Sequence, residues 1–325
     1  MEKLYFRAGK DDAGRRFDRV LRTFLEEKGM SDIYKALRKG LIRVNGHKVQ
    51  PDYKVEEYDE ISIAAFIMDD SRNGAELPSL NNPAGGKFSI HTVFENAHLK
   101  IINKPYDVSV HGRDSLESVM NHELHPSCTS LSFKPGPLHR LDRKTTGLLA
   151  YSLSIEGARW FSAAISEHVV KKYYIGISQG KIDAACHWND MITSEKNRGS
   201  SFYMMKESSG DSENERLAET TAVPLAYGSY GGVNVTLTQF QIMTGVKHQI
   251  RLQSSIHGFP LLGDTAYGGR KIHEKQDFFL HALELHFPES NPLELPLVLR
   301  AEMTGDFAAV MKKALIKWDC RTIIF

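Results

Sequence analysis

PLHRLDRKTTGLLAYSLS, residues 137–154, passes from a polar loop into a continuous apolar run. The loop carries Asp142 between Arg140 and Arg143, and residues 148–153 then predict a buried strand. A carboxylate among cations stays ionised, and at the mouth of a strand it is suited to act as a nucleophile or a base. An aspartate beside arginines is an ordinary ion pair in most proteins, however, so this pattern alone favours a structural interpretation.

The chain on both sides of this stretch alternates predicted strands and helices. Short apolar runs predict further strands at residues 93–94, 99–102, 172–178 and 233–243. Residues 154–167 predict a helix with Phe161 on its inward face. The total length of 325 residues allows two domains with at least one sizeable core.

Residues 14–65 predict a small module that begins with two helices. Apolar residues at the spacing of one helix face predict the first helix over residues 15–28, with Gly29 as its C-cap. Ser31 is then the expected N-cap of a second helix, which Gly40 ends.

A predicted hairpin completes this module. The pair Asn45-Gly46 between short apolar runs is a strong signal for a two-residue turn, with a return strand through Val49. Residues 60–64 predict one more strand. Residues 68–86 are rich in Asn, Gly, Pro and Ser and have no period, so they predict a linker.

Charge is segregated along the chain. The totals of 41 Lys and Arg and 40 Asp and Glu give a net charge of +1, which by itself argues against a nucleic-acid partner. Between residues 30 and 50, however, Asp32 is the sole acidic residue among five cations: Lys35, Arg38, Lys39, Arg43 and Lys48. The linker and residues 207–219, which predict an acidic solvated loop, offset them in the sum. Such a cluster fits a nucleic-acid surface and a solvated helix face about equally well.

Composition excludes several classes of protein. With 41% hydrophobic and 25% charged residues, the chain is not collagen-like, disordered or a coiled coil. Its three cysteines are far apart, which argues against a disulfide framework and fits a reducing compartment. The sequence has no apolar run of membrane-spanning length and no signal-peptide pattern at its start. We therefore expect a soluble cytoplasmic protein.

HRLDRKTTGLL, residues 139–149, closely resembles the signature of the RluA family of pseudouridine synthases. The resemblance implies that Asp142 is the catalytic residue. VKKYY, residues 170–174, resembles the block that carries the family's active-site tyrosine, here Tyr174. TGVKHQIRLQSSIHGFPLLGDTAYGG, residues 244–269, resembles the block with the active-site basic residue, here Arg251. Weaker matches lie at residues 103–105 and 280–282.

Some positions depart from the family pattern. Thr146 stands where Ser is usual and keeps a hydroxyl, and Asp107 replaces a usual Gly. Val246 replaces a usual Arg or Lys, and Gln253 a frequent His, so we expect altered RNA contacts there. The three implied catalytic residues are intact.

SDIYKALRKGLIRVNGHKVQPDYKVEEYDEISI, residues 31–63, resembles the small RNA-binding domain named after ribosomal protein S-four. That family places its basic helix and hairpin against structured RNA, so the five cations above become expected RNA contacts. Tyr58 stands where the family usually has Gly. Because tyrosine tolerates a positive φ poorly, we expect the turn there to differ.

The family's reaction breaks the C1′–N1 bond of uridine and rejoins the same base through C5, which requires no cofactor and no metal. The resemblance implies that Asp142 either stabilises or traps positive charge at C1′ or promotes loss of the C2′ proton. Arg251 is expected to hold Asp142 by a charge-assisted pair, and Tyr174 to stack on the uracil and take part in proton transfer. The target base must leave its stack, and His139 and Arg140 are expected to contact the surrounding phosphates or fill the vacated space.

The resemblance implies an α+β fold, in which a mixed, largely antiparallel sheet flanked by helices forms the catalytic domain beside a small α+β RNA-binding domain. The expected domains are residues 1–66 for RNA binding, 67–87 as linker and 88–325 for catalysis. The expected function is pseudouridine formation in structured large-subunit ribosomal RNA or its precursor, by a monomer similar to the RluC and RluD types.

Three alternatives remain open on the sequence. The enzyme could act on transfer RNA, or the chain could be a non-catalytic RNA-binding factor for ribosome assembly. A glycosidase or nuclease would need a second paired carboxylate or metal ligands, and the sequence offers no such arrangement.

Overall fold

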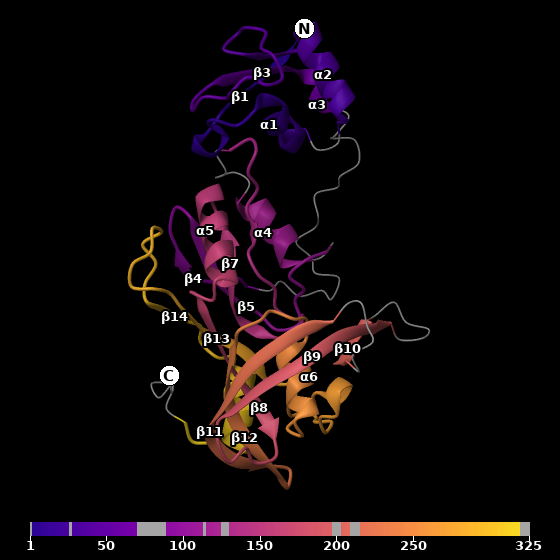
Figure 1. Cartoon of the computed structure of the whole chain (residues 1–325), viewed down its shortest axis with the longest axis vertical. Helices are drawn as coiled ribbons and strands as arrows, with labels where there is room; N and C mark the ends of the chain where they lie inside the picture. Colours follow the sequence, from indigo (N-terminus) through magenta and orange to yellow (C-terminus); the bar gives the residue numbers. More distant parts are fainter. Residues whose placement is uncertain are drawn as a thin grey trace.

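The computed structural model describes residues 2–25, 28–69, 89–112, 115–124, 130–196, 203–208 and 215–318. Within these residues the chain forms an N-terminal part, residues 2–69, and a C-terminal part, residues 89–318, each with its own sheet and core (Figure 1). The residues predicted as a linker fall mostly outside the described ranges.

The N-terminal part is built on an antiparallel sheet in the order β1-β3-β2. Its elements, in chain order, are β1 (Lys3–Arg7), η1 (Lys10–Asp12), α1 (Phe17–Phe24), α2 (Met30–Lys39), β2 (Ile42–Val44), β3 (Glu60–Ala64) and α3 (Ala65–Asp69). Buried Phe17 and Leu21 of α1 and Ile33 of α2 pack against the sheet. The two predicted helices are therefore present, together with strand β1, which was not predicted.

Several boundaries differ from the prediction. Because α1 ends at Phe24, Gly29 is the N-cap of α2 and not a C-cap, and Ser31 lies inside that helix. Gly40 does end α2, with φ of 71°. The predicted return strand through Val49 is reduced to one bridge between Val44 and His47, because β2 pairs instead with the distant β3.

The turn at Tyr58 has the positive φ that is normally adopted by glycine and that tyrosine tolerates poorly. Tyr58 has φ of 74°, in the left-handed region, so the expectation of a different turn is wrong. The buried carboxylate of the next residue, Asp59, explains this. It accepts hydrogen bonds from Asn45 Nδ2, the Tyr53 hydroxyl and Glu56 N–H, at 2.7, 3.0 and 2.8 Å. These contacts hold the backbone against the local preference of tyrosine.

The C-terminal part carries an 11-stranded sheet, whose main path runs β10-β9-β11-β12-β8-β13-β7-β5-β4, with β14 and β6 paired at β13 and β7. Its strands are β4 (His91–Glu95), β5 (Leu99–Lys104), β6 (Gly136–Pro137), β7 (Thr146–Ser152), β8 (Lys171–Gln179), β9 (Cys186–Lys196), β10 (Tyr203–Glu207), β11 (Arg216–Tyr230), β12 (Val233–Ile242), β13 (Leu280–His286) and β14 (Val298–Arg300). Its helices are α4 (Leu116–Leu124), α5 (Ile155–Ser166), α6 (Gln249–Ile256), η3 (Thr265–Tyr267) and α7 (Gly305–Lys313).

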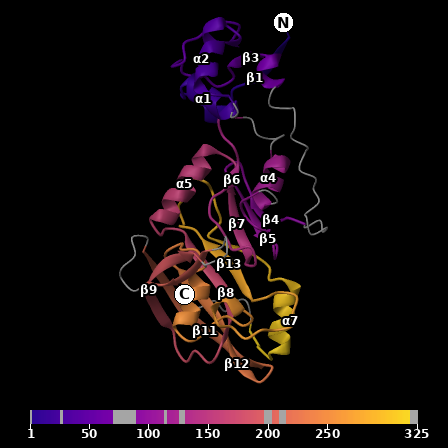
Figure 2. The same cartoon turned by 90° about the vertical axis from the view of Figure 1, so that its right-hand side faces the viewer.

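Helices cover both faces of this sheet because successive residues of a strand point to opposite sides. On β7, Leu148 and Ala150 pack with α5, whereas Leu149 and Tyr151 lie in the core that includes α4 and α6. Figure 2 shows α4 and α5 on opposite sides of β7. Helix α7 packs on Ile175 of β8.

All pairings of described strands are antiparallel except β13 with β7, which confirms the predicted α+β fold with a mixed, largely antiparallel sheet. Gly147 permits the parallel pairing, because its φ is 107° and a Cβ there would lie 2.2 Å from the Ala282 carbonyl oxygen. The predicted acidic loop is wrong at residues 216–219, which begin β11, and residues 209–214 lie outside the described ranges.

A polar contact joins the two parts. The buried carboxylate of Asp12 accepts hydrogen bonds from the backbone N–H groups of Leu131 and Ser132, at 2.9 and 2.8 Å, and from two serine hydroxyls of the same segment. Arg15 donates to the carbonyl of Ser132 at 2.9 Å, and the Leu131 side chain packs against the N-terminal core. We call these contacts the Asp12 latch. The latched segment leads directly into β6, the strand that precedes Asp142.

Candidate active site

Asp142 lies in the loop of residues 138–145, between β6 and β7, which we call the Asp142 loop. Its carbonyl accepts a hydrogen bond from Thr145 N–H at 3.0 Å, which closes the turn before β7. The Asp142 side chain is 15% exposed, at the meeting point of two hollows of about 250 and 490 Å³. A carboxylate in this place is accessible to a ligand in either hollow.

The two hollows differ in what lines them. The smaller, which we call the tyrosine cavity, is lined by His139, Ile165, Lys172, Tyr174, Ile242 and Leu280. The larger, which we call the basic groove, has walls that include Val110, His111, Arg143 and Lys144. Both share Arg140, Asp142, Lys247, His248 and Arg251. The tyrosine cavity is near the lower limit of small-ligand pockets, roughly 300 Å³, and so suits a single flat group.

Arg251 reaches Asp142 but is held by another carboxylate. Its Nη1 lies 3.5 Å from Asp142 Oδ2, whereas Nε and Nη2 donate to the two oxygens of Asp264 at 2.7 and 2.8 Å. The guanidinium also lies over the rings of Tyr267 and Phe278. Burial opposes its charged form, but Asp264 and then Asp142 outweigh burial and raise the pKa of Arg251. The expected pair with Asp142 is therefore a longer contact, and Asp264 is the residue that orients the cation.

His248 is a second group that faces Asp142. It precedes α6 with φ of 56°, and its Nε2 lies 3.7 Å from Asp142 Oδ1. Its Nδ1 is 2.7 Å from the Tyr267 hydroxyl, which accepts a hydrogen bond from Met205 N–H. The hydroxyl proton is thus available to Nδ1, so a neutral His248 presents its N–H at Nε2 to Asp142. Burial lowers the pKa of His248, although Asp142 acts in the opposite direction.

Tyr174 forms one wall of the tyrosine cavity. It comes from β8, whose residue 174 pairs with Ala282 of β13 and Phe240 of β12, at the centre of the sheet. Tyr174 is 6% exposed and belongs to the core that contains Leu141 and Leu280. Burial and then the charge of Asp142 raise the pKa of Tyr174, so the phenol is protonated near neutral pH.

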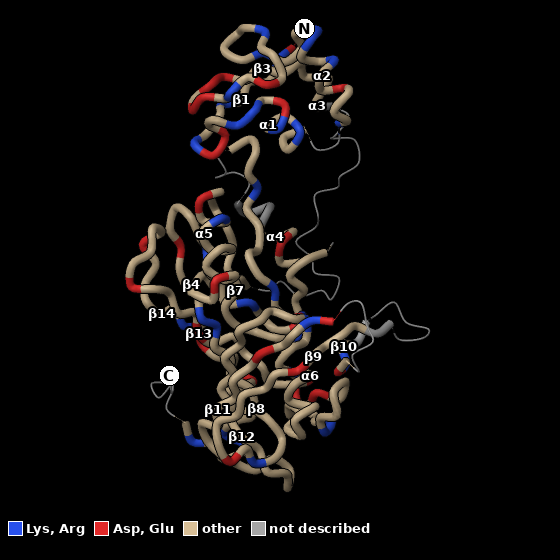
Figure 3. Tube along the Cα trace, viewed as in Figure 1, with Lys and Arg blue, Asp and Glu red and all other residues tan. Residues whose placement is uncertain are grey.

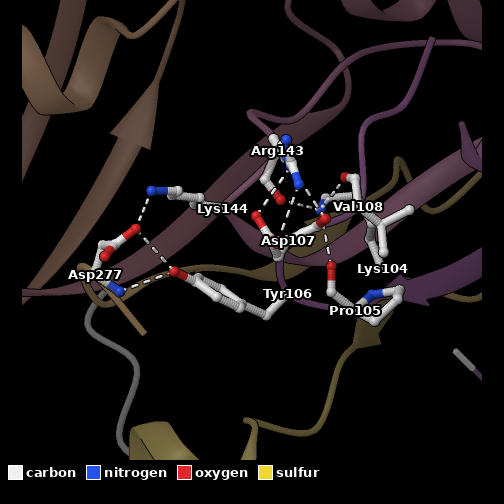
Figure 4. Close-up of polar contacts among 8 residues, drawn as sticks. All are labelled: Lys104, Pro105, Tyr106, Asp107, Val108, Arg143, Lys144 and Asp277. Atoms are coloured by element: carbon white, nitrogen blue, oxygen red, sulfur yellow. Dashed lines mark hydrogen bonds and ion pairs between the residues drawn. The ribbon is translucent and has the colours of Figure 1, made fainter. Parts of the chain in front are cut away.

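The Asp142 loop is fastened to the end of β5 (Figure 4). The buried ammonium of Lys104 donates to the carbonyl of Arg143, and the Arg143 side chain forms an ion pair with Asp107 at 2.9 Å. Lys144 pairs with Asp277, whose backbone N–H donates to the Tyr106 hydroxyl at 2.8 Å. The two residues that follow Asp142 are thus tied to segments distant in sequence.

His139 and Arg140 take different positions. His139 Nε2 accepts a hydrogen bond from Ala150 N–H at 3.1 Å, and the ring stacks on Phe161 of α5. Burial, followed by the charge of Lys172, lowers the pKa of His139 to about 3. A neutral ring used in this way is poorly suited to the expected phosphate contact. Arg140 is exposed at the junction of both hollows, as an RNA contact would be.

All five cations predicted to bind RNA in the N-terminal part lie at the surface of α2 and the hairpin, and four of them are exposed. Arg43 is half-buried and donates to the carbonyls of Gly40 and Gly46, at 3.2 and 3.1 Å. The side chain of Lys48 also lies against Gly40. The end of α2 and the hairpin therefore share one surface. Figure 3 shows that acidic residues also occur in the N-terminal part. The four exposed cations are Lys35, Arg38 and Lys39 on α2, and Lys48 after β2.

Gln253 and Val246, the two departures expected to alter RNA contacts, take different positions: Val246 is half-buried and lines the tyrosine cavity, whereas Gln253 does not. Gln253 is fully buried, where it donates to Asp190 at 2.6 Å and accepts from the Thr220 hydroxyl. Val246 packs against a core cluster beside α6. Gln253 therefore contributes to the fold and not to an RNA surface.

Among the described residues, no group of three or more His, Cys, Asp or Glu side chains is arranged to hold a metal ion. No helix in the described part of the chain is long and apolar enough to cross a membrane.

Comparisons with known proteins agree with this geometry. Residues 98–255 match the model of the RNA pseudouridylate synthase family. The chain is 30% identical over 292 residues to the ribosomal large subunit pseudouridine synthase C of Vibrio cholerae, with 86% of each chain covered. It is 28% identical over 316 residues to the protein of that name from Escherichia coli K12, with 91% of each covered.

Solved structures share the fold. Human RNA pseudouridylate synthase domain containing 4 matches with a TM-score of 0.56 and 22% identity, over 70% of this chain and 94% of that one. Human RNA pseudouridylate synthase domain containing 1 matches with a TM-score of 0.54 and 24% identity, over 66% and 84%.

Proposed function

The chain belongs to the RNA pseudouridylate synthase family and is an isomerase that converts uridine to pseudouridine, and we propose that its substrate is large-subunit ribosomal RNA or its precursor. The observation that carries this proposal is 30% identity, over 86% of the chain, to a relative named for large-subunit ribosomal RNA. The alternatives of a transfer-RNA enzyme and a non-catalytic assembly factor are not favoured by such relatives.

We propose that Asp142 is the catalytic carboxylate. It lies where the tyrosine cavity meets the basic groove, so a uridine whose base entered the cavity would present its sugar to Asp142. From there the carboxylate can stabilise or trap positive charge at C1′ or take the C2′ proton. The cations that line the groove are placed to hold the phosphates of the extruded nucleotide.

Arg251 and Tyr174 have supporting roles in this proposal. Arg251, oriented by Asp264, directs Nη1 to Asp142 and places a positive charge beside the carboxylate. Tyr174 offers its ring to the uracil as a stacking surface. Because burial raises its pKa, the phenol enters the reaction protonated, which favours stacking over service as a base.

The proposal includes the domain division 1–66, 67–87 and 88–325, with the first as an RNA-binding domain, and a cytoplasmic monomer. Support for the division comes from the separate core and sheet of the N-terminal part. Size-exclusion chromatography with light scattering tests the monomer.

The catalytic assignment is tested on large-subunit ribosomal RNA transcribed without modifications. Purified protein should form pseudouridine with no added metal or nucleotide, and Asp142→Asn should abolish product while RNA affinity stays within a few-fold. Asp183→Asn, an exposed aspartate paired with Lys181, is the matched control and should remain active. Pseudouridine formed by Asp142→Asn would refute the catalytic role of Asp142. Pseudouridine formed by the wild type on transfer RNA alone would refute ribosomal RNA as the substrate.

The RNA-binding role of the N-terminal part is tested by charge removal. Replacing Lys35, Arg38 and Lys39 with Gln should weaken binding to all sequences, and the salt slope should fall by about one for each phosphate that is no longer neutralised. A control variant carries Gln at three exposed lysines of the C-terminal part, Lys271, Lys275 and Lys312. Equal slopes for the two variants would refute the role.

A further inference from the structure

Lys172 is a buried cation without a counter-charge. It is 7% exposed and lines the tyrosine cavity, two residues before Tyr174 on the same face of β8. Within the described part of the chain, no hydrogen bond or ion pair of its ammonium is found, whereas buried Lys104 contacts three carbonyls and buried Arg251 contacts Asp264. A buried charge without a partner is costly, so a ligand that brings negative charge into the cavity would gain from pairing with it.

The tyrosine cavity is polarised by this arrangement. Asp142 lies where it meets the basic groove, and Lys172 lines it together with Tyr174 and His139. Burial and then the charge of Lys172 lower the pKa of His139, so the ring beside Lys172 is neutral. Burial also lowers the pKa of Lys172. A ligand that becomes positive on its sugar and negative on its base would therefore meet opposite charges at both ends.

We infer that Lys172 is a further catalytic residue, which donates a hydrogen bond to a carbonyl oxygen of the uracil as it leaves C1′. This inference rests on the proposed function of Asp142 at the same site. When the C1′–N1 bond breaks, both electrons stay with N1 and the negative charge spreads to O2 and O4. Fixed donors aimed at a developing anion lower the barrier because they need no reorganisation.

Lys172 keeps its proton throughout the reaction. The electrons of the uracil anion form the new C1′–C5 bond as the Asp142–C1′ bond breaks or, on the other route, as the C2′ proton returns from Asp142. The C5 proton then leaves to a base and N1 gains a proton, so the net change is an isomerisation. The uracil departs as an anion whether Asp142 attacks C1′ or takes the C2′ proton. The role of Lys172 is thus independent of which route operates.

A phosphate is the other anionic group of the substrate that Lys172 could meet. The basic groove already holds Arg143 and Lys144, which are exposed or half-exposed and absent from the lining of the tyrosine cavity. Lys172, in contrast, lines the cavity and is absent from the lining of the groove. This separation favours the base over the phosphate.

The first experiment compares wild type, Lys172→Met and Lys172→Arg in single-turnover reactions on ribosomal RNA that the wild type modifies. For Lys172→Met we expect RNA affinity within about threefold and a rate lower by roughly 10²–10³, the loss typical of one oxyanion donor. Lys172→Arg should recover part of the rate. The melting temperature of Lys172→Met should not fall, because a buried unpaired charge is removed. A wild-type rate for Lys172→Met would overturn the inference.

The second experiment identifies the contacted atom. Target uridines carrying sulfur at position 2 or 4 present a weaker acceptor, and one of them should slow the wild type without slowing Lys172→Met further. Equal slowing of both proteins would overturn the contact. If an uncharged methylphosphonate beside the target uridine removes the difference in rate between wild type and Lys172→Met, Lys172 contacts that phosphate and not the base. Failure of the wild type to make pseudouridine would count against the proposed function, a separate outcome.

Discussion

Lys104 of β5 donates a hydrogen bond to the main-chain carbonyl of Arg143, the residue that follows Asp142, at 2.9 Å. The same ammonium donates to the carbonyls of Pro105 and Val108, both at 2.8 Å, so all three of its hydrogens are used. Its side chain is fully buried. The Asp142 loop is therefore fastened from inside the protein to the end of β5.

Lys104→Met should loosen this fastening. The apolar side chain fills the space but leaves three carbonyls unpaired, each costing about 1–3 kcal/mol if water does not replace the donor. We expect the free energy of unfolding to fall by about 2–4 kcal/mol and kcat to fall at least tenfold, because Asp142 is no longer held in place. Urea denaturation and single-turnover kinetics measure the two effects. The control is Lys100→Met on the same strand, where the partly exposed pair with Glu95 is worth about 0–1 kcal/mol. Equal losses in both variants would refute the fastening.

Substitutions of Asp107 compare two contributions to stability: the strain of its left-handed backbone and its ion pair with Arg143. It has φ of 62°, in the left-handed region, and its carboxylate pairs with Arg143 at a largely exposed site. Asp107→Gly relieves the strain and loses the pair, so we expect the free energy of unfolding to change by less than about 1 kcal/mol. Asp107→Val should cost about 1–3 kcal/mol, because a β-branched residue resists positive φ. Urea denaturation distinguishes them. If Gly is as damaging as Val, the ion pair is the dominant contribution.

Asp264→Asn should uncouple Arg251 from its support. The buried guanidinium would keep a neutral acceptor but lose its counter-charge, and breaking a buried pair costs about 3–5 kcal/mol, with Asn near the lower end. We expect a lower melting temperature and at least a tenfold loss of kcat with little change in RNA affinity. The control, Asp306→Asn, removes a half-exposed carboxylate 3.9 Å from Lys275 and should change neither. An unchanged kcat in Asp264→Asn would show that Arg251 needs no orienting partner.

His139 gives the fold a sensitivity to acid. Burial and Lys172 lower its folded pKa to about 3, below the usual value of about 6.5 in an unfolded chain. Between these pH values the unfolded state binds the extra proton, so the free energy of unfolding falls as pH falls, by at most about 1.4 kcal/mol per pH unit. His139→Gln keeps an acceptor for Ala150 N–H and cannot titrate. Its melting temperature should therefore decline less than that of the wild type from about pH 6.5 to about pH 4.5. Parallel declines would contradict the assignment.

Local signals in the sequence predicted the elements that carry Asp142 and Tyr174. The apolar run of β7 and the one-faced pattern of α5 depend on neighbouring residues alone, and both elements form where they were predicted. Strand β1 was missed because its order depends on pairing with β3, which is distant in sequence. The hairpin return strand was overestimated for the same reason, since β3 takes the place beside β2.

The sequence predicted which residues form the candidate site better than it predicted how those residues contact one another. Family resemblance pointed to Asp142, Tyr174 and Arg251, and the fold brings them to the same cavity. Asp264 stands within the block that resembles the family, yet its pairing with Arg251 depends on how α6 and the following turn pack. His139 belongs to a polar stretch of sequence, but the N–H of Ala150 recruits it as an acceptor.

The Asp12 latch should control the placement of the N-terminal part. Asp12→Ala removes an acceptor shared by Leu131 and Ser132 N–H and two serine hydroxyls, so the segment leading to β6 loses its anchor. We expect weaker binding of ribosomal RNA, by about tenfold or more, because a mobile part must be ordered on binding. Cleavage near residue 131 by a protease should also become faster. Asp32→Asn on the exposed face of α2 is the control and should leave cleavage unchanged. If Asp12→Ala keeps both the affinity and the protease resistance of the wild type, Leu131 packing alone holds the two parts together.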